Sequence, residues 1–123
     1  MSLAVASKKC PPLLKGGVVT EAAFQSRLIR KLKRIFPGCV VLKNDPQQTQ
    51  GILDLTILWG PFWGMLEVKA ERDSRRRPNQ DYYVEVLDDM SFAAYIFPDN
   101  EEEVLLALQE TFASRRAACL PFS

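Results

Sequence analysis

Apolar and polar positions alternate along this chain in patterns that predict helices and strands in turn. The first clear pattern follows Thr20, a good helix N-cap, with Glu21 at the first helical position. Apolar residues then recur at helical spacing until Pro37-Gly38, which should stop the helix. The apolar stripe consists of Phe24, Leu28, Leu32, Ile35 and Phe36.

The middle of the chain carries the strand signals. Residues 39–43 read as a short strand and residues 44–50 as a polar loop. Residues 51–59 and 65–70 are apolar runs of strand length, separated by the turn residues 60–64. We therefore expect these two runs to form a hairpin.

The second half of the chain returns to helical spacing. Pro78 suits the first turn of a helix, which should bury Tyr83, Val86, Leu87 and Met90. Residues 93–97 then predict a strand and residues 98–100 a turn. A last helix should start near Asn100, because Asn100 and Glu103 have capping-box spacing.

The predicted order of elements is α-β-β-β-α-β-α, which belongs to the α/β class. A meander of strands followed by a helical crossover gives a mixed central sheet flanked by helices. We expect one domain over residues 18–113. Residues 1–17 lack periodicity and are interpreted as a flexible leader, and residues 114–123 as a frayed tail.

Composition excludes several classes of protein. The chain has 123 residues and a net charge of +1, so nucleic-acid binding would have to come from local basic clusters. It contains no histidine, which excludes histidine triads and histidine metal sites. Its cysteines (Cys10, Cys39 and Cys119) form no CxxC pair, which disfavours zinc and suits a reducing cytoplasm. We expect a cytoplasmic protein, since neither a signal peptide nor a membrane-spanning run is evident.

Three charged residues occupy awkward positions in the predicted hairpin. Asp54 lies near the start of one apolar strand, while Glu67 and Lys69 share a face of the next. Charged side chains on neighbouring strands are costly to bury unless they bind something together. A divalent metal and a phosphate would fit. The alternative is a simple ion pair at a strand edge.

Two further polar residues lie on apolar helix faces. Glu21 precedes Phe24 and Leu28 at helical spacing, so we expect it to point inward. The alternative is an exposed carboxylate that interacts with the helix dipole. Gln80 should likewise face the sheet, unless it serves only to hydrogen-bond backbone.

The chain also has two basic clusters and an aromatic pair in a turn. Arg72, Arg75, Arg76 and Arg77 follow the Glu67-Val68-Lys69 segment, and a second cluster on the first helix includes Lys31 and Arg34. Such clusters are either solvated faces or phosphate-binding sites. Phe62 and Trp63 could pack on the core, contact a second copy or stack on splayed bases.

Taken together, these motifs resemble the PD-(D/E)xK nuclease superfamily. The resemblance is carried by Glu21, Gly51-Ile52-Leu53-Asp54, Glu67-Val68-Lys69 and Gln80, and covers roughly residues 18–112. Within the superfamily the chain is most similar to the small stand-alone VRR-NUC proteins of phages, which are related to Holliday-junction resolvases. One departure is Leu53, where the family usually has proline. Another is Arg77, where serine often precedes the helix proline.

The resemblance implies a restriction-endonuclease-like core and an endonuclease dependent on Mg²⁺ or Mn²⁺. It implies that Asp54, Glu67, Glu21 and the Val68 carbonyl bind the metal. Lys69 would be the catalytic lysine, and Gln80 would support the site. The implied substrate is DNA, branched or four-way, cleaved by a homodimer in a bacterial or phage-infected cell. A site-specific homing or restriction-type nuclease and a non-catalytic DNA-binding module are the alternatives. The residues expected to contact DNA are Arg72, Arg75, Arg76, Arg77, Lys31 and Arg34.

Overall fold

The computed structural model describes residues 20–119, apart from the side chain of Cys119. The leader predicted for residues 1–17 and the last residues of the predicted tail lie outside this range. The described chain is an α/β fold in the predicted order. Its helices and strands are α1 (Glu21–Ile35), β1 (Val40–Lys43), β2 (Leu55–Trp59), β3 (Phe62–Val68), α2 (Gln80–Met90), β4 (Ala93–Ile96), the 3₁₀ turn η2 (Pro98–Asn100) and α3 (Glu101–Cys119).

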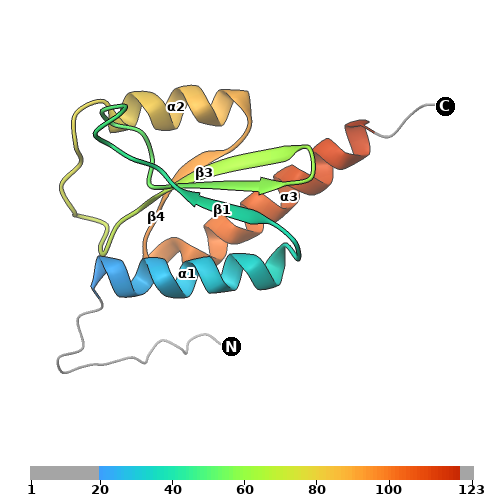
Figure 1. The fold of residues 1–123 in the computed structure, drawn as a ribbon, viewed down its shortest axis with the longest axis horizontal. Coiled ribbons are helices and arrows are strands. Elements are labelled where there is room, and N and C mark those ends of the chain that lie inside the picture. The colour runs from blue at the N-terminus through green and yellow to red at the C-terminus, as the bar shows by residue number, and fades with distance from the viewer. Residues whose placement is uncertain (1–19, 120–123) are drawn as a thin grey trace.

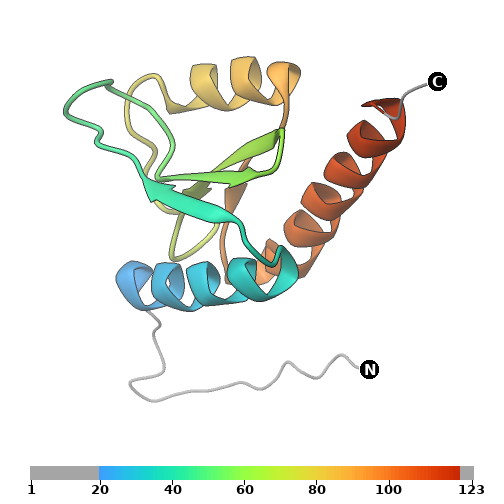
Figure 2. The same cartoon turned by 45° about the vertical axis from the view of Figure 1, so that its right-hand side comes forward.

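The strands form one mixed sheet, as the sequence predicted, and the structure gives their order as β1-β2-β3-β4. The pairs β1–β2 and β2–β3 are antiparallel, whereas β3 and β4 are parallel and joined through α2. Figure 1 shows α2 on one side of the sheet and α1 and α3 on the other. The view in Figure 2 separates α1 from α3 and shows the same layers.

The core lies between the sheet and the layer formed by α1 and α3. Phe24, Leu28 and Leu32 of α1 are fully buried there, as their spacing predicted. Leu108 of α3 packs against Gly64 of β3, where an added Cβ would lie 2.9 Å from the Leu108 Cδ1 atom. Glycine at this position therefore lets the helix approach the strand closely.

The hairpin between β2 and β3 is tighter than predicted. Only Gly60 and Pro61 separate the strands, and Gly60 has a positive φ of 62° that suits a tight turn. Phe62 is buried and stacks on Phe112 at 5.7 Å between ring centroids, so it belongs to the core and not to a DNA wedge. Trp63 is half-buried in β3. The error arose because Gly64 was read as a turn residue, although its role is packing.

The strand and helix limits differ elsewhere by a few residues. Residues 51–54 precede β2 instead of belonging to it, and α2 begins at Gln80, two residues after Pro78. Met90, expected in the core, is 60% exposed because it ends α2 beyond the sheet. The predicted tail was partly wrong, since residues 114–119 continue α3.

The predicted capping box at the last helix is also wrong. The Asn100 side chain accepts a hydrogen bond from the Phe97 N–H at 2.9 Å and donates one to the Tyr95 carbonyl at 3.2 Å. These bonds join the end of β4 to the η2 turn that precedes α3. The Asn100 side chain is thus used by the preceding residues and does not pair with Glu103. Across residues 20–119, none of the helices is long and apolar enough to cross a membrane.

Candidate active site

Two hydrogen bonds hold Asp54 against Glu67 and Val68 at the end of β3. The Asp54 backbone N–H donates to the Glu67 Oε1 atom at 3.1 Å, and the Val68 backbone N–H donates to the Asp54 Oδ2 atom at 3.0 Å. This arrangement follows from the antiparallel register, in which Leu55 pairs with Leu66. The next positions outward along the two strands are Asp54 and Glu67. The sequence prediction that they lie together is confirmed.

Glu67 is the buried centre of the group. Only 1% of the residue is exposed, and its Oε2 atom accepts a hydrogen bond from the Gln80 Nε2 atom at 2.6 Å. The same oxygen lies 3.4 Å from the Lys69 Nζ atom. Burial raises the pKa of Glu67, and the nearby Asp54 charge raises it further, while Lys69, Gln80 and Arg77 lower it. The carboxylate is thus costly to ionise in isolation and depends on its cationic neighbours.

Lys69 is held by three acceptors. Its Nζ atom donates to the Arg75 carbonyl at 2.9 Å and to the Gln80 Oε1 atom at 3.1 Å, in addition to its contact with Glu67. The two hydrogen bonds use two of the three protons of the ammonium group, and the contact with Glu67 is an ion pair. The Lys69 backbone N–H continues the β3–β4 ladder by donating to the Ile96 carbonyl at 2.9 Å. The amine is therefore fixed beside the Glu67 carboxylate.

Gln80 connects the parts of the site. The residue is fully buried, which confirms that it faces the sheet. Its amide nitrogen donates to Glu67, while its Oε1 atom accepts from Lys69 and from the Arg77 backbone N–H at 2.9 Å. Gln80 therefore bonds both side chain and backbone, and the two alternatives weighed for it are not exclusive.

The start of α2 is positioned by Gly51. Gly51 has a φ of 90°, and an added Cβ would lie 2.6 Å from the Asn79 Cβ atom and 2.7 Å from the Pro78 carbonyl oxygen. The loop before β2 thus packs directly on the residues that precede α2. Asn44 fixes the same loop by donating to the Leu53 carbonyl at 2.8 Å. Leu53, where the resembled family has proline, is fully buried beside Asp54.

Arg77 joins the site in a way that the sequence did not reveal. Its Nη2 atom lies 3.6 Å from the Asp54 Oδ1 atom and 3.4 Å from the Glu67 Oε2 atom. We expected this arginine to contact DNA from a loop. The sequence placed Arg77 in the basic cluster that follows Lys69. The position of a residue within a loop does not specify where its side chain points.

Glu21 does not point inward. Residues 21–23 are all exposed, and burial on α1 begins only at Phe24, because the first turn of the helix is not covered by another element. Within residues 20–119, no hydrogen bond or ion pair joins Glu21 to Asp54 or Glu67. Its place in the first helical turn matches the alternative interpretation, an acid at the positive end of the helix dipole.

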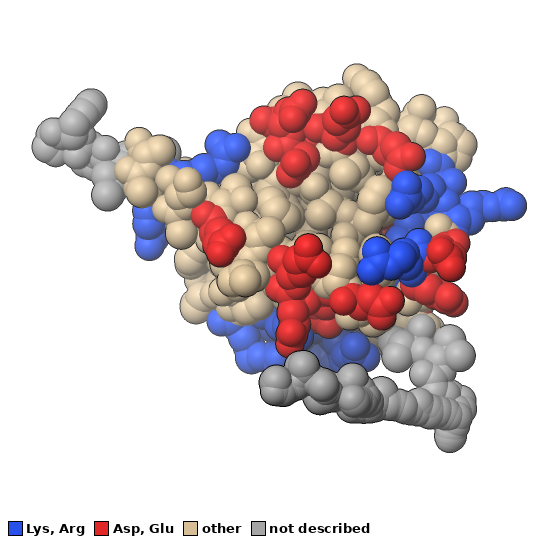
Figure 3. Space-filling view, turned by 180° about the vertical axis from the view of Figure 1, so that it is seen from behind, with Lys and Arg blue, Asp and Glu red and all other residues tan. Residues whose placement is uncertain are grey.

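The other basic residues do not contact Asp54 or Glu67 in the described part of the chain. Arg76 lies over the Tyr95 ring at 4.4 Å and 3.3 Å from the Asp81 Oδ1 atom, and Arg72 lies over the Phe97 ring at 4.7 Å. Arg34 and Arg75 are exposed. On α1, Lys31 forms an ion pair with Glu101 at 3.0 Å. Figure 3 shows a group of Lys and Arg side chains at one edge of the molecule, with acidic side chains on both sides of it.

The donor set at the site fits a hard divalent cation. Asp54 and Glu67 supply carboxylate oxygens, and Mg²⁺ is usually held by one or two carboxylates, with water and substrate phosphate as the other ligands. In the described part of the chain, no group of three or more His, Cys, Asp and Glu side chains could hold a metal ion. Any metal here would therefore depend on this carboxylate pair and on non-protein ligands. The Val68 N–H bonds Asp54, and the role of its carbonyl stays a prediction.

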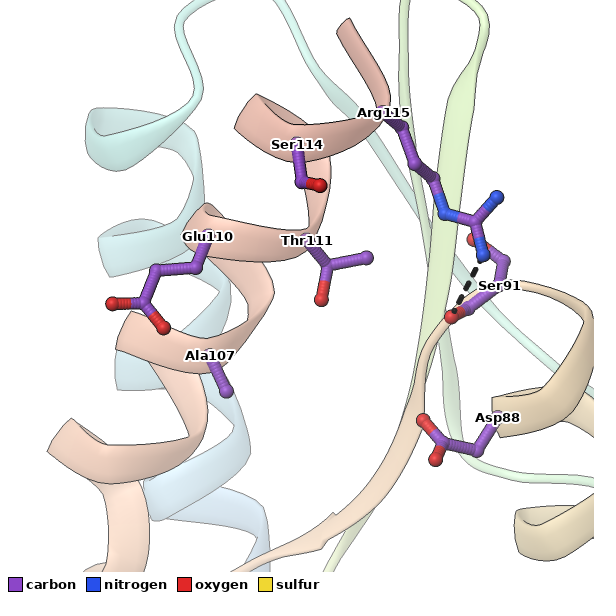
Figure 4. Close-up of a pocket in the computed structure, with 7 residues that line it drawn as sticks. All are labelled: Asp88, Ser91, Ala107, Glu110, Thr111, Ser114 and Arg115. Atoms are coloured by element: carbon purple, nitrogen blue, oxygen red, sulfur yellow. Dashed lines mark hydrogen bonds between the residues drawn. The ribbon is translucent and has the colours of Figure 1, made fainter. Parts of the chain in front are cut away.

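A separate hollow lies at the C-terminal end of α2, whereas the site lies at its N-terminal end. This open pocket of about 510 Å³ lies between the end of α2 and α3 (Figure 4). Arg115 crosses its mouth and donates to the Ser91 carbonyl at 3.5 Å, and Asp88 bonds the Ala93 N–H at 3.1 Å. Asp88 and Arg115 thus hydrogen-bond the local backbone in this pocket.

Comparison of the chain with protein families, with curated proteins and with solved structures finds no significant match. The function of the chain therefore has to be inferred from the geometry of the site.

Proposed function

We propose that this protein is a metal-dependent DNA endonuclease of the PD-(D/E)xK type. One observation carries the proposal: Asp54, Glu67 and Lys69 lie in a single hydrogen-bonded group with the buried Gln80. A purely structural ion pair would need neither a second carboxylate nor a buried amide. Carboxylates grouped with a fixed lysine are what phosphodiester hydrolysis requires. The restriction-endonuclease-like core is part of this proposal, which the order of elements supports.

Asp54 and Glu67 would hold Mg²⁺ or Mn²⁺. When bound there, the metal would supply charge neutralisation at the phosphoryl oxygens. The Asp54 Oδ1 atom is the more accessible ligand, because the other oxygen of this carboxylate bonds the Val68 N–H. Glu67 is fixed from the protein side by Gln80 and by the Asp54 backbone. The pair thus combines an accessible ligand with a rigid one.

Lys69 would position the attacking water and offset negative charge that develops on the phosphate. Its two short hydrogen bonds, to Arg75 and Gln80, fix the side chain from behind. The 3.4 Å contact with Glu67 is the weakest of the three and is the one that a water molecule could replace. Gln80 would act as a positioning residue, because it holds both charged groups without facing solvent.

DNA would approach the end of the molecule where the loop between β3 and α2 carries its arginines. The guanidinium groups of Arg72 and Arg76 lie over aromatic rings, which restricts the conformations of these side chains. Binding a phosphate would therefore cost them less conformational entropy. On the face drawn in Figure 3, acidic side chains lie close to this basic edge. A small net charge and a local basic edge suit contacts with a few phosphates near the scissile bond.

A homodimer would make paired cuts possible on branched DNA, which is the proposed substrate. Strand β1 lies at the edge of the sheet, and Val40 and Leu42 on it are 50% and 45% exposed. Leu58, opposite Val40 in the register, adds a third exposed apolar side chain to the same face. An open strand edge with an apolar face favours association with a second copy.

The direct test is incubation of the purified protein with linear duplex, with supercoiled plasmid and with a four-way junction. Each substrate is used with Mg²⁺, with Mn²⁺ and with EDTA. We expect cleavage of the junction only with metal, and loss of cleavage in Asp54→Asn and Glu67→Gln. Asp89→Asn and Glu85→Gln, exposed acids of α2, are matched controls that should retain cleavage.

Other outcomes would favour the alternatives. Cleavage of linear duplex at one sequence would favour a homing or restriction-type nuclease with the same site. Salt-dependent DNA binding that is independent of metal, with no cleavage of any substrate, would favour a non-catalytic binding module. That last result would overturn the proposed enzyme.

A further inference from the structure

Arg77 occupies the position where the two candidate metal ligands converge. A single nitrogen, Nη2, lies 3.6 Å from the Asp54 Oδ1 atom and 3.4 Å from the Glu67 Oε2 atom. The other oxygens of the two carboxylates are bonded to backbone N–H groups. The guanidinium therefore contacts the carboxylate oxygens that face away from the backbone.

The two carboxylates require a cation between them. Like charges held close together by fixed hydrogen bonds cannot move apart, so neutralisation has to come from a third group. Lys69 neutralises Glu67 from one side, whereas Arg77 is the cation that contacts both acids.

The structure also gives Arg77 a way to leave. Its side chain is 43% exposed, in contrast to the 1% of Glu67, so it approaches the pair from the solvent side. Its backbone is held separately, because the Arg77 N–H donates to the Gln80 Oε1 atom. The side chain can thus rotate outward without moving the loop that bonds Lys69 and Gln80.

We propose that Arg77 is a resident counter-cation that a divalent metal must displace. Metal and guanidinium would compete for the Asp54 and Glu67 carboxylates, and the displaced side chain would then be free to contact a phosphate. This inference rests on the proposed function for the identity of the site, but it concerns metal-free protein as well. It predicts that Arg77 stabilises the empty site and weakens metal binding.

The experiment compares Arg77→Ala, Arg77→Lys and Arg75→Ala by titration calorimetry with Mn²⁺ alone. Arg75→Ala is matched, because it removes the same charge from the same loop while its side chain is exposed and its carbonyl stays available to Lys69. We expect Arg77→Ala to bind Mn²⁺ about three- to tenfold more tightly than wild type. The Mn²⁺ affinity of Arg77→Lys should fall between those of wild type and Arg77→Ala. Arg75→Ala should change the Mn²⁺ affinity by less than about twofold.

Thermal unfolding supplies a second measurement. In EDTA, Arg77→Ala should melt at a lower temperature than Arg75→Ala, and Mn²⁺ should raise its melting temperature by more than that of wild type. Equal or weaker Mn²⁺ binding by Arg77→Ala would overturn the inference while leaving the nuclease intact. Tighter binding without cleavage of DNA would support the inference and overturn the nuclease. If no protein bound Mn²⁺, both proposals would be wrong.

Discussion

The backbone N–H of Asp54 donates to the Glu67 carboxylate at 3.1 Å, so the two acids are joined through main chain as well as through shared cations. This bond fixes the end of the loop before β2 against the end of β3. The separation of the two carboxylates is therefore set by the sheet and not by side-chain rotation. If the pair binds the proposed metal, its two carboxylates are already held in place by these bonds, which would lower the cost of binding.

Replacing Lys69 by methionine should abolish most cleavage while preserving metal binding. Methionine keeps the apolar stem in its buried position but removes the charge beside Glu67. Loss of one preorganised donor at a transition state typically lowers kcat by about 10²- to 10³-fold. Single-turnover cleavage assays would measure the rate, and Mn²⁺ titration would measure binding. An unchanged cleavage rate would remove Lys69 from the mechanism.

Replacing Gln80 by alanine should destabilise the protein by about 1–3 kcal/mol, the usual cost of leaving buried polar partners unsatisfied. Glu67, Lys69 and the Arg77 N–H would each lose one hydrogen-bond partner. Urea denaturation would measure the free energy of unfolding. Gln109→Ala is the control, because Gln109 is an exposed glutamine of α3. Equal stability of the two variants would contradict this central role.

Gly51→Ala should be more damaging than Gly38→Ala. Both glycines have a φ near the left-handed region, 90° and 87°, but only Gly51 has atoms of Pro78 and Asn79 within contact of an added Cβ. The difference between the variants therefore isolates the close packing of the loop on the start of α2. We expect it to exceed about 1 kcal/mol in the free energy of unfolding. The Gly51 variant should also lose cleavage activity, since displacement of α2 moves Gln80.

Periodicity predicted much of this fold because it reports burial directly. The stripe from Phe24 to Phe36, the order of the elements and the mixed sheet were all evident in the sequence. The pairing of Asp54 with Glu67 followed from two strands joined by a short turn. Gln80 was found because a polar residue on an apolar face is informative.

What the sequence did not reveal depends on tertiary context. Helical spacing placed Glu21 on the same face of the helix as the buried residues. Spacing does not show whether another element covers that turn of the helix. Gly64 resembles a turn residue until α3 is seen to pack on it. The direction of the Arg77 side chain is set by its contacts with Asp54 and Glu67, which are distant from it in the sequence. Such contacts between segments have no local signature.

The raised pKa of Glu67 should appear as a pH-dependent difference in stability. A carboxyl group whose pKa is raised above the ordinary value of 4.5 binds its proton more tightly in the folded state. Its contribution to stability is thus present below pH 4.5 and is lost as the pH rises through the folded pKa. Relative to Glu67→Gln, the wild type should therefore lose stability as the pH rises above 4.5. Urea denaturation in EDTA at several pH values would measure the difference. Glu85→Gln should show no such trend, and a trend of opposite sign for Glu67 would contradict the assigned shift.

The proposed homodimer predicts that a charge on the β1 face prevents association. Val40→Lys would place an ammonium group beside Leu42 and Leu58 at the open edge of the sheet, where a second copy would have to desolvate it. Sedimentation velocity should show a dimer for wild type and a monomer for the variant, with both folded by circular dichroism. Leu106→Lys is the matched control, because Leu106 is a similarly exposed apolar residue, at 57%, on α3. A monomeric wild type would disprove the dimer, and a dimer that persists in Val40→Lys would exclude this face as its interface. If the face is correct, the variant should still bind Mn²⁺ through Asp54 and Glu67 but should no longer make paired cuts in a four-way junction.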